Sequence, residues 1–324
     1  MVAIALLGTA LAAPQSTDPW SFGPAGDEPR PIINGVLEEA HPAAVGLGLD
    51  GLGITVCSGN LITPELVLTA AHCTADFPDE LVTALGVAFF GTYPLESETR
   101  PIAEVRLHPD YVPLDPGGST LGAYDVALIR LAEPADVDPV WFRTDPFDAE
   151  EVEGTTVLSV GWGLDENDES YVKRSAELVI EELHPMFLIS RAGGNPGRTS
   201  ICSGDSGGPQ YVQDADGTLV QWSVHSWAST RCQGESGSVR TDVVASWVLE
   251  QVADVHGSAD RCAAWSRYDD GLCDADCDQP DPDCRSNLAS TDPRSGGAEV
   301  SRVDGTGCQT TPAAPSSWRW WRRR

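Results

Sequence analysis

The sequence predicts an all-β fold that ends in one helix, and two observations support this class. Short apolar runs rich in β-branched residues alternate with glycine, proline and aspartate, which is typical of short antiparallel strands joined by turns. Four such runs occupy residues 60–70, 125–131, 155–160 and 219–226. Toward residue 250 the apolar spacing becomes helical, with repeats at Val244, Trp247, Val248, Val252 and Val255. Strands of this length form either a β-barrel or a β-sandwich, and the pattern leaves both open.

The composition narrows the choice of partners. The 324 residues suffice for one large domain or two smaller ones. The chain carries 49 acidic and 20 basic residues, a formal net charge of −29. Such an acid excess repels phosphate backbones, so nucleic acid is not an expected partner. The same charge keeps copies of the chain apart, and we expect a monomer.

Cysteines and the N-terminus indicate the compartment. Nine cysteines at uneven spacing suggest disulfides and therefore an oxidising environment. Residues 1–13 contain a short apolar run that ends in the small-residue pattern Ala10-Leu11-Ala12, which predicts a signal peptide. This run is too short to cross a bilayer, and no other segment is expected to do so. The sequence therefore predicts a secreted, extracytoplasmic protein.

Composition shifts along the chain predict five parts. A main domain is bounded by segments rich in proline, glycine, serine or aspartate, which do not bury a core. The predicted parts are a signal peptide (1–13), a pro-segment or linker (14–31), the main domain (32–257), a small module rich in cysteine and aspartate (261–284) and a disordered tail (285–324).

Three stretches of the main domain carry the residue types that amide hydrolysis by a serine requires. Residues 204–209 read Gly-Asp-Ser-Gly-Gly-Pro, and the glycines around Ser206 allow a tight turn whose N–H groups can converge. His72 follows an apolar run and can serve as a base. Asp125 begins a buried-looking strand, where its carboxylate can be shielded and still orient an imidazole.

These three stretches, in this order, resemble the trypsin/chymotrypsin family of serine proteases. Residues 32–35 (Ile-Ile-Asn-Gly) are similar to the family's mature N-terminus, and residues 161–163 (Gly-Trp-Gly) to a turn of its second barrel. Ser226-Trp227 is similar to its substrate-binding strand, and the resemblance covers about residues 32–256. It implies two six-stranded antiparallel β-barrels with a C-terminal helix, an active site between the barrels, a protein or peptide substrate, and neither cofactor nor metal.

The resemblance also assigns roles to the catalytic residues. It implies that Ser206 is the nucleophile, that His72 is the general base and then the general acid, and that Asp125 holds the imidazole tautomer. The backbone N–H groups of Gly204 and Ser206 would form the oxyanion hole. The implied activity is that of a serine endopeptidase.

Activation is implied at the start of the main domain. After cleavage, the new α-ammonium of Ile32 would pair with Asp205 and fix the oxyanion loop, as in the family's zymogens. Arg30 is followed by Pro31, whereas such zymogens are often cut between a basic residue and the isoleucine. Release of Ile32 therefore requires hydrolysis of the Pro31–Ile32 bond or a different activation scheme.

The resemblance implies two disulfides in the main domain. One would join Cys57 to Cys73 and pin the histidine loop, and the other would join Cys202 to Cys232 across the specificity pocket.

The small module suggests two more bridges, whose pairing the sequence leaves open among its four cysteines. These cysteines are Cys262, Cys273, Cys277 and Cys284. Its alternating carboxylates are expected to be solvated acids, with Ca²⁺ binding as the alternative. The module resembles repeats appended to bacterial exported proteins, so we expect a bacterial, secreted member of the family. Cys308 and the arginine-rich end suggest a tail with a spare thiol, with association with the cell surface as the alternative.

The substrate pocket is assigned by position from Ser206. The resemblance gives substrate-binding roles to Ser200, Ser226, Trp227, Ala228 and Ser238. Ser200 would lie at the base, where trypsins carry an aspartate, so a basic substrate side chain would find no partner charge. Ala228 and Ser238, with Gly237 as an alternative to Ser238, would narrow the walls. These features predict cleavage after small or medium apolar residues, with His225 as a packed wall residue.

Parts of the sequence are also compatible with two other functions. Residues 204–208 also match the Gly-x-Ser-x-Gly elbow of α/β-hydrolases, so an esterase could use Ser206 with Asp242 and His256. That alternative gives His72 no role and lacks the expected alternation of strands and helices. The other alternative is an inactive binding module on the protease fold, which the presence of all three catalytic residue types disfavours.

Overall fold

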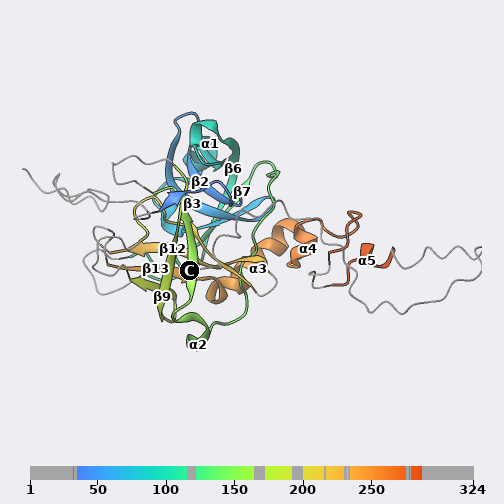
Figure 1. Cartoon of the computed structure of the whole chain (residues 1–324). Helices are drawn as coiled ribbons and strands as arrows, with labels where there is room; N and C mark the ends of the chain where they lie inside the picture. Colours follow the sequence, from blue (N-terminus) through green and yellow to red (C-terminus); the bar gives the residue numbers. More distant parts are fainter. Residues whose placement is uncertain are drawn as a thin grey trace, which may run out of the picture. The chain divides into compact units, whose positions relative to one another are not determined.

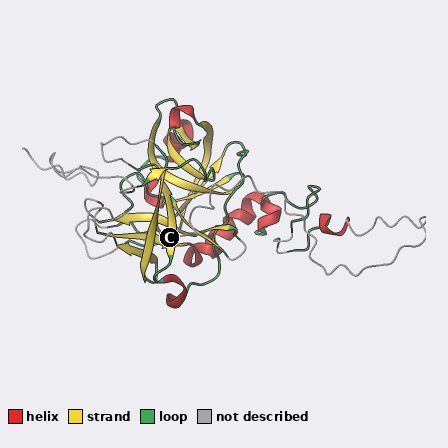
Figure 2. Cartoon of the chain, in the orientation of Figure 1, coloured by secondary structure: helices red, strands yellow, loops and turns green. Residues whose placement is uncertain are grey.

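The computed structural model describes residues 32, 35–114, 122–163, 172–191, 200–214, 217–229, 232, 234–274, 277 and 279–286. The predicted signal peptide, pro-segment and tail, with Cys308, lie outside the described residues. The chain divides into two units, residues 1–245 and 246–324, which are described separately. Strands dominate the first unit (Figure 2).

Six antiparallel strands close into a first barrel in the order β2-β3-β4-β7-β6-β5 (Figure 1). The strands are β2 (Ala44–Leu49), β3 (Ile54–Thr63), β4 (Leu66–Thr69), β5 (Gly86–Phe90), β6 (Glu98–Leu107) and β7 (Ala127–Leu131). Short helical segments lie between them, namely η1 (Ala71–Cys73), α1 (Asp79–Leu85) and η2 (Pro94–Glu96). The barrel interior is apolar, since β4 is buried along its whole length and β7 at all positions except Arg130.

A second antiparallel sheet has the order β1-β9-β10-β13-β12-β11-β8, and pairing of β8 with β9 closes six of its strands into a barrel. Its strands are β1 (Val36–Leu37), β8 (Thr156–Gly161), β9 (Arg174–Leu183), β10 (Phe187–Arg191), β11 (Pro209–Gln213), β12 (Leu219–Ala228) and β13 (Glu235–Arg240). The short helix α2 (Ala149–Val152) precedes β8. The predicted pair of six-stranded barrels is therefore confirmed, with β1 added at the edge of β9.

A buried polar seam joins the two barrels. Asn60 of β3 accepts a hydrogen bond from the Tyr211 hydroxyl of β11 (2.6 Å) and donates one to the Gln221 side chain of β12 (2.7 Å). All three side chains are almost completely buried. Because unpaired polar groups at such depth would cost free energy, these bonds favour one placement of the first barrel on the second.

The C-terminal helix predicted from the valine spacing is α3 (Thr241–His256), which begins in the first unit and ends in the second. The second unit also contains α4 (Arg261–Ala264) and α5 (Asp283–Ser286). No helix among the described residues has the length and apolarity needed to span a membrane.

Two disulfides hold the small module, which has too few residues for an apolar core of its own. The structure pairs Cys262 with Cys277 and Cys273 with Cys284, which the sequence left open. Several of its carboxylates accept backbone hydrogen bonds within the module: Asp281 from Asp274, and Asp283 from Gly271. These carboxylates therefore serve the turns of the module, and Ca²⁺ binding there stays a prediction.

Candidate active site

His72 and Asp125 meet through two hydrogen bonds. His72 lies in η1, directly after β4, and Asp125 lies two residues before β7, which pairs with β4. The imidazole Nδ1 lies 2.7 Å from Asp125 Oδ2, and the backbone N–H of His72 donates to Oδ1 at 2.9 Å. Asp125 is 6% exposed. The carboxylate therefore fixes the imidazole from two directions and favours the tautomer with Nδ1 protonated.

Ser226 contributes a third bond to this carboxylate. Its hydroxyl donates to Asp125 Oδ2 at 2.6 Å, from β12 of the second barrel. The resemblance gave Ser226 a role in substrate binding only, so the sequence did not predict this contact with Asp125. Tyr124, which precedes Asp125, has a φ of 51° and stacks on His108 with ring centroids 4.6 Å apart. This strained turn helps to aim Asp125 at His72.

Ser206 lies in a turn whose shape depends on glycine. Gly204 and Gly207 have φ values of 93° and 82°, a region that residues with a Cβ rarely adopt. The Ser206 carbonyl accepts a hydrogen bond from the Ser58 backbone N–H at 2.7 Å, and the Ser58 hydroxyl donates to the Gly204 carbonyl at 2.9 Å. Residues of the first barrel thus hold the Ser206 turn beside the segment that carries His72.

Asp205 is completely buried beneath this turn. It accepts hydrogen bonds from the backbone N–H groups of Gly163 (2.8 Å), Cys202 (2.9 Å) and Ile32. Burial raises the pKa of Asp205 to about 7, and the three N–H donors partly offset this effect. Ile32 itself is 1% exposed. The two residues that the sequence paired for activation are therefore brought together.

The Gly-Trp-Gly turn is explained by its contact with Asp205. A Cβ on Gly163 would lie 2.7 Å from Asp205 Oδ2, and one on Gly161 would collide with Oδ1. Only glycine allows the backbone to approach the carboxylate this closely. Trp162 between them is fully buried.

Two disulfides brace the site, in the pairs that the resemblance implied. Cys57–Cys73 ties β3 to the residue after His72, and Cys202–Cys232 ties the Ser206 loop to the segment before β13. Among the described residues, Cys57, Cys73 and His72 are brought together as potential metal ligands. Because the two cysteines form a disulfide, this group is not a metal site.

The strand register places Ser236, rather than the predicted pocket residue Ser238, opposite Ala228. Ala228 of β12 pairs with Ser236 of β13, and Trp227 pairs with Gly237. Ser238 pairs instead with His225, lies 3.1 Å from its Nδ1 through the hydroxyl, and is 1% exposed. The residue that faces Ala228 is therefore Ser236, and Ser238 lies further along the strand.

Two further residues of the predicted pocket region, Ser200 and His225, are buried. Ser200 is 1% exposed, and its hydroxyl donates to the neighbouring Ile201 carbonyl. His225 is fully buried, and burial lowers its pKa to about 3. The imidazole is therefore neutral near pH 7, in agreement with the expected packed wall residue.

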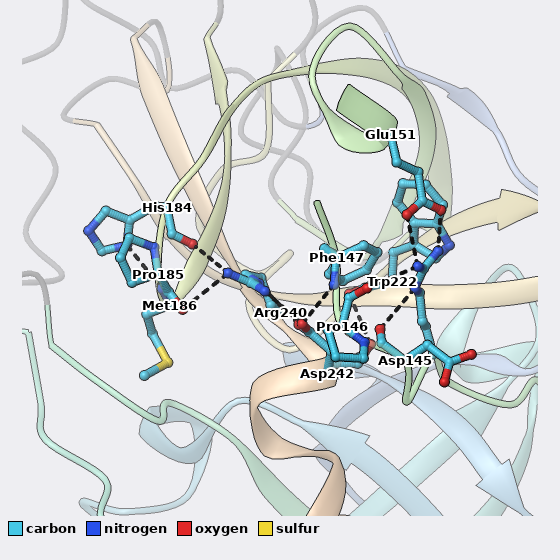
Figure 3. Close-up of polar contacts among 12 residues, drawn as sticks. Asp145, Pro146, Phe147, Glu151, His184, Pro185, Met186, Trp222, Arg240 and Asp242 are labelled. Carbon is cyan, nitrogen blue, oxygen red and sulfur yellow. Dashed lines mark hydrogen bonds and ion pairs between the residues drawn. The ribbon is translucent and has the colours of Figure 1, made fainter. Parts of the chain in front are cut away.

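The α/β-hydrolase alternative is wrong, because the fold consists of two antiparallel barrels. Asp242 forms an ion pair with Arg240 (2.6 Å) and accepts the Phe147 backbone N–H (3.1 Å). Figure 3 shows Arg240 reaching from this carboxylate to the turn at His184 and Pro185, whose carbonyls accept its hydrogen bonds. Asp242 therefore has a structural role at the start of α3.

Comparison with known proteins supplies the family. The family model described as Trypsin matches residues 33–248. Pig (Sus scrofa) coagulation factor XII is 31% identical over an alignment of 250 residues, which covers 68% of this chain and 39% of factor XII. The chain belongs to the trypsin family of serine proteases.

Two other relatives show how far the likeness extends. Clotting factor C of Tachypleus tridentatus is 29% identical over 238 residues, 60% of this chain and 22% of that protein. Kallikrein 1-related peptidase b22 of Mus musculus is 29% identical over 217 residues, 61% of this chain and 80% of the kallikrein. The chain thus spans well under half of the two clotting factors. All three relatives are animal proteins, so the expected bacterial origin stays a prediction.

Proposed function

We propose that this chain is a serine endopeptidase that hydrolyses peptide bonds through an acyl-enzyme at Ser206. The observation that carries the proposal is the Asp125 carboxylate, which bonds His72 at both the ring and the backbone. An imidazole held in this way carries its lone pair on Nε2, the nitrogen that takes a proton from a serine hydroxyl in this chemistry. The family membership supports the same chemistry.

In the proposed reaction, the Ser206 oxygen attacks the scissile carbonyl carbon and its proton moves to His72 Nε2. The imidazolium then gives this proton to the leaving amine as the C–N bond breaks, which leaves an ester on Ser206. Water attacks this ester with His72 again as base, and Ser206 regains its proton. Asp125 remains ionised and stabilises the imidazolium at each step.

The oxyanion that forms in each attack is assigned to the backbone N–H groups of Gly204 and Ser206. The positive φ of Gly204 and the bond from Ser58 to its carbonyl fix the orientation of this turn. Neither N–H group donates a hydrogen bond to another described residue. Two preorganised donors of this kind stabilise a developing negative charge by several kcal/mol.

We further propose that the enzyme prefers small or medium apolar side chains before the scissile bond. Ser200 offers a buried hydroxyl rather than a carboxylate at the assigned base, so a basic side chain has no partner charge there. Ala228 and its cross-strand partner Ser236 narrow the walls more than two glycines would. His225 is neutral and offers no cation to an acidic side chain.

Activation and localisation complete the proposal. The contact of Ile32 with Asp205 supports a zymogen in which cleavage before Ile32 creates an ammonium for that carboxylate. The four disulfides support an oxidising, extracytoplasmic compartment, and a protein or peptide is the proposed substrate.

A fluorophosphonate probe tests the central claim, because it reacts covalently with an activated serine. We expect labelling of the native protein at Ser206, located by peptide mass mapping, and no labelling after heat denaturation. A matched control is Ser97→Ala, since Ser97 bonds the Tyr93 carbonyl in the first barrel and should not affect labelling. A native protein that takes no label would favour the inactive binding module instead.

A further inference from the structure

Lys173 is the only lysine in the chain, and it is 2% exposed. Charged side chains are rarely buried this deeply unless specific partners surround them. The proposed reaction gives Lys173 no task, so its burial calls for another explanation.

The backbone around Lys173 joins three parts of the first unit. Its N–H donates to the Thr92 carbonyl between β5 and η2, and its carbonyl accepts the Glu38 N–H from the N-terminal segment. The Thr92 hydroxyl in turn donates to the Glu38 carbonyl at 2.9 Å. Lys173 also directly precedes β9 of the second barrel. It therefore lies where the N-terminal segment, the first barrel and the second barrel meet.

The Lys173 side chain links the N-terminal segment, residues 35–44, to the Gly-Trp-Gly turn at residues 161–163. The ammonium donates to the His41 carbonyl and lies 5.2 Å from the centroid of the Trp162 ring. Glu38 is close enough to favour the charged form of Lys173, and its own carboxylate is held 3.0 Å from His41 Nδ1. A cation that contacts both a carbonyl of one segment and a ring of the other holds the two together.

From Trp162 the contacts continue to the oxyanion turn. The backbone N–H of Trp162 donates to the Ser58 hydroxyl at 3.0 Å, and this hydroxyl donates to the Gly204 carbonyl. The next residue, Gly163, donates its N–H to Asp205. A shift of Trp162 would therefore move the donors that position both Gly204 and Asp205.

We propose that Lys173 is a positioning residue, whose ammonium holds residues 35–44 against the Trp162 turn and thereby keeps the Gly204–Asp205 peptide in place for catalysis. This inference rests on the proposed peptidase function. It predicts that the charge of Lys173, and not merely its bulk, controls the rate of the chemical step.

The charge of Lys173 depends on pH within an accessible range. Burial lowers its pKa to about 8, although Glu38 partly offsets the shift. The titratable side chains around it are Glu38, whose pKa is lowered to about 2, His41, and Tyr211, whose pKa is raised well above its usual value. Lys173 is therefore expected to change charge between pH 7 and 9, and kcat should fall across this range.

A single lysine allows this titration to be observed directly. Biosynthetic incorporation of ¹³C-lysine gives one Cε signal per molecule, and we expect its shift to titrate near pH 8 in the native protein. This measurement needs no activity, so it stands even if the protein proves not to be a peptidase. A midpoint near the value of an exposed lysine would contradict the burial of the ammonium between the two segments, on which the proposal rests.

Two variants separate charge from bulk. Lys173→Met keeps the length of the side chain and loses the charge, so kcat at pH 7 should fall by about tenfold while KM changes by less than about twofold. Above pH 9 the variant and the wild type should converge, because the wild-type lysine is then neutral. Lys173→Arg keeps the charge at all accessible pH values, so it should retain most of the activity and shift the alkaline loss of kcat to higher pH.

The proposed ammonium of Ile32 would also titrate in the alkaline range, and the arginine variant distinguishes the two groups. If Ile32 alone sets the alkaline loss, Lys173→Arg leaves that loss where it is in the wild type, which contradicts the role of Lys173. Arg106→Met, which removes a cation bonded to Glu104 on the first barrel, serves as the control and should change nothing. An active wild type with a Lys173→Met variant of equal kcat would also refute the inference. Failure of the wild type to react with the fluorophosphonate would instead refute the proposed function.

Discussion

Asp205 accepts a hydrogen bond from the backbone N–H of Ile32 while Ile32 is still joined to Pro31. In this intact chain, Ile32 offers an amide and no positive charge. Burial therefore raises the pKa of the Asp205 carboxylate, and backbone N–H dipoles offset this effect only in part. The uncut chain and the cut chain should differ in how their stability responds to pH.

In the uncut chain, Asp205 should destabilise the fold as the pH rises. Its pKa is raised from 3.8 to about 7, so between these values the folded state holds a proton that the unfolded state has released. The free energy of unfolding then falls as the pH increases across this window. Urea unfolding at several pH values, compared with Asp205→Asn, isolates this contribution from the other carboxylates. After cleavage the Ile32 ammonium should lower the pKa, and equal pH slopes in the two forms would contradict the pairing.

Ser206→Ala and His72→Ala should each reduce kcat on a peptide amide by roughly 10⁴-fold to 10⁶-fold, because the two residues act as a unit. The melting temperature should change little in either variant. Asp242→Asn is the informative comparison, since Asp242 pairs with Arg240 and should affect stability more than turnover. A His72 variant that retains activity would remove the basis of the proposed mechanism.

Ser226→Ala tests whether the Ser226 hydroxyl supports the Asp125 carboxylate or binds the substrate. The bond from Ser226 to Asp125 is 2.6 Å long and involves a charged acceptor, a type that contributes about 1.5–3 kcal/mol. Its loss should lower kcat by roughly tenfold to a hundredfold, with KM nearly unchanged. A rise in KM without a fall in kcat would show that Ser226 acts through substrate binding alone.

We expect specificity to depend on the cross-strand pair Ala228 and Ser236. We expect cleavage after Ala, Val or Leu to exceed cleavage after Phe, with Arg and Lys lowest. Ser236→Gly and Ala228→Gly should each raise kcat/KM for Phe substrates by about tenfold, since crowding of this kind costs about 1–3 kcal/mol. Ser238→Gly is the matched control and should not admit Phe, because Ser238 faces His225. A wild-type profile dominated by Arg would show that another carboxylate reaches the pocket.

The sequence was most informative where chemistry requires a fixed residue type. The residues around Ser206, His72 and Asp125 made each of them a candidate, and the structure brings His72 and Asp125 together. The spacing of valines identified α3. The sequence could not identify Ser236 as the partner of Ala228. The register of β12 against β13 shifts between His225 and Trp227, and an irregularity of this kind moves later pairs by one residue without a mark in the sequence.

Lys173 shows a different limit of prediction from the sequence. A lone lysine beside an arginine is normally expected at the surface, because burial of a charge is costly. Glu38 and the His41 carbonyl lie far from Lys173 and Trp162 in the sequence, and only the fold brings these groups together. The pairing of the four module cysteines was open for a similar reason, since several pairings satisfy the same spacing.

The burial of the single lysine also affects how the protein can be labelled. Because no second ε-amine exists, the folded chain offers amine-directed reagents little besides its N-terminus. Conjugation with an activated ester should therefore attach one dye per molecule, and glutaraldehyde should join few copies to one another. Cleavage before Ile32 would place the new terminus in a buried position against Asp205. The same reagent would then report activation as a loss of label rather than a gain.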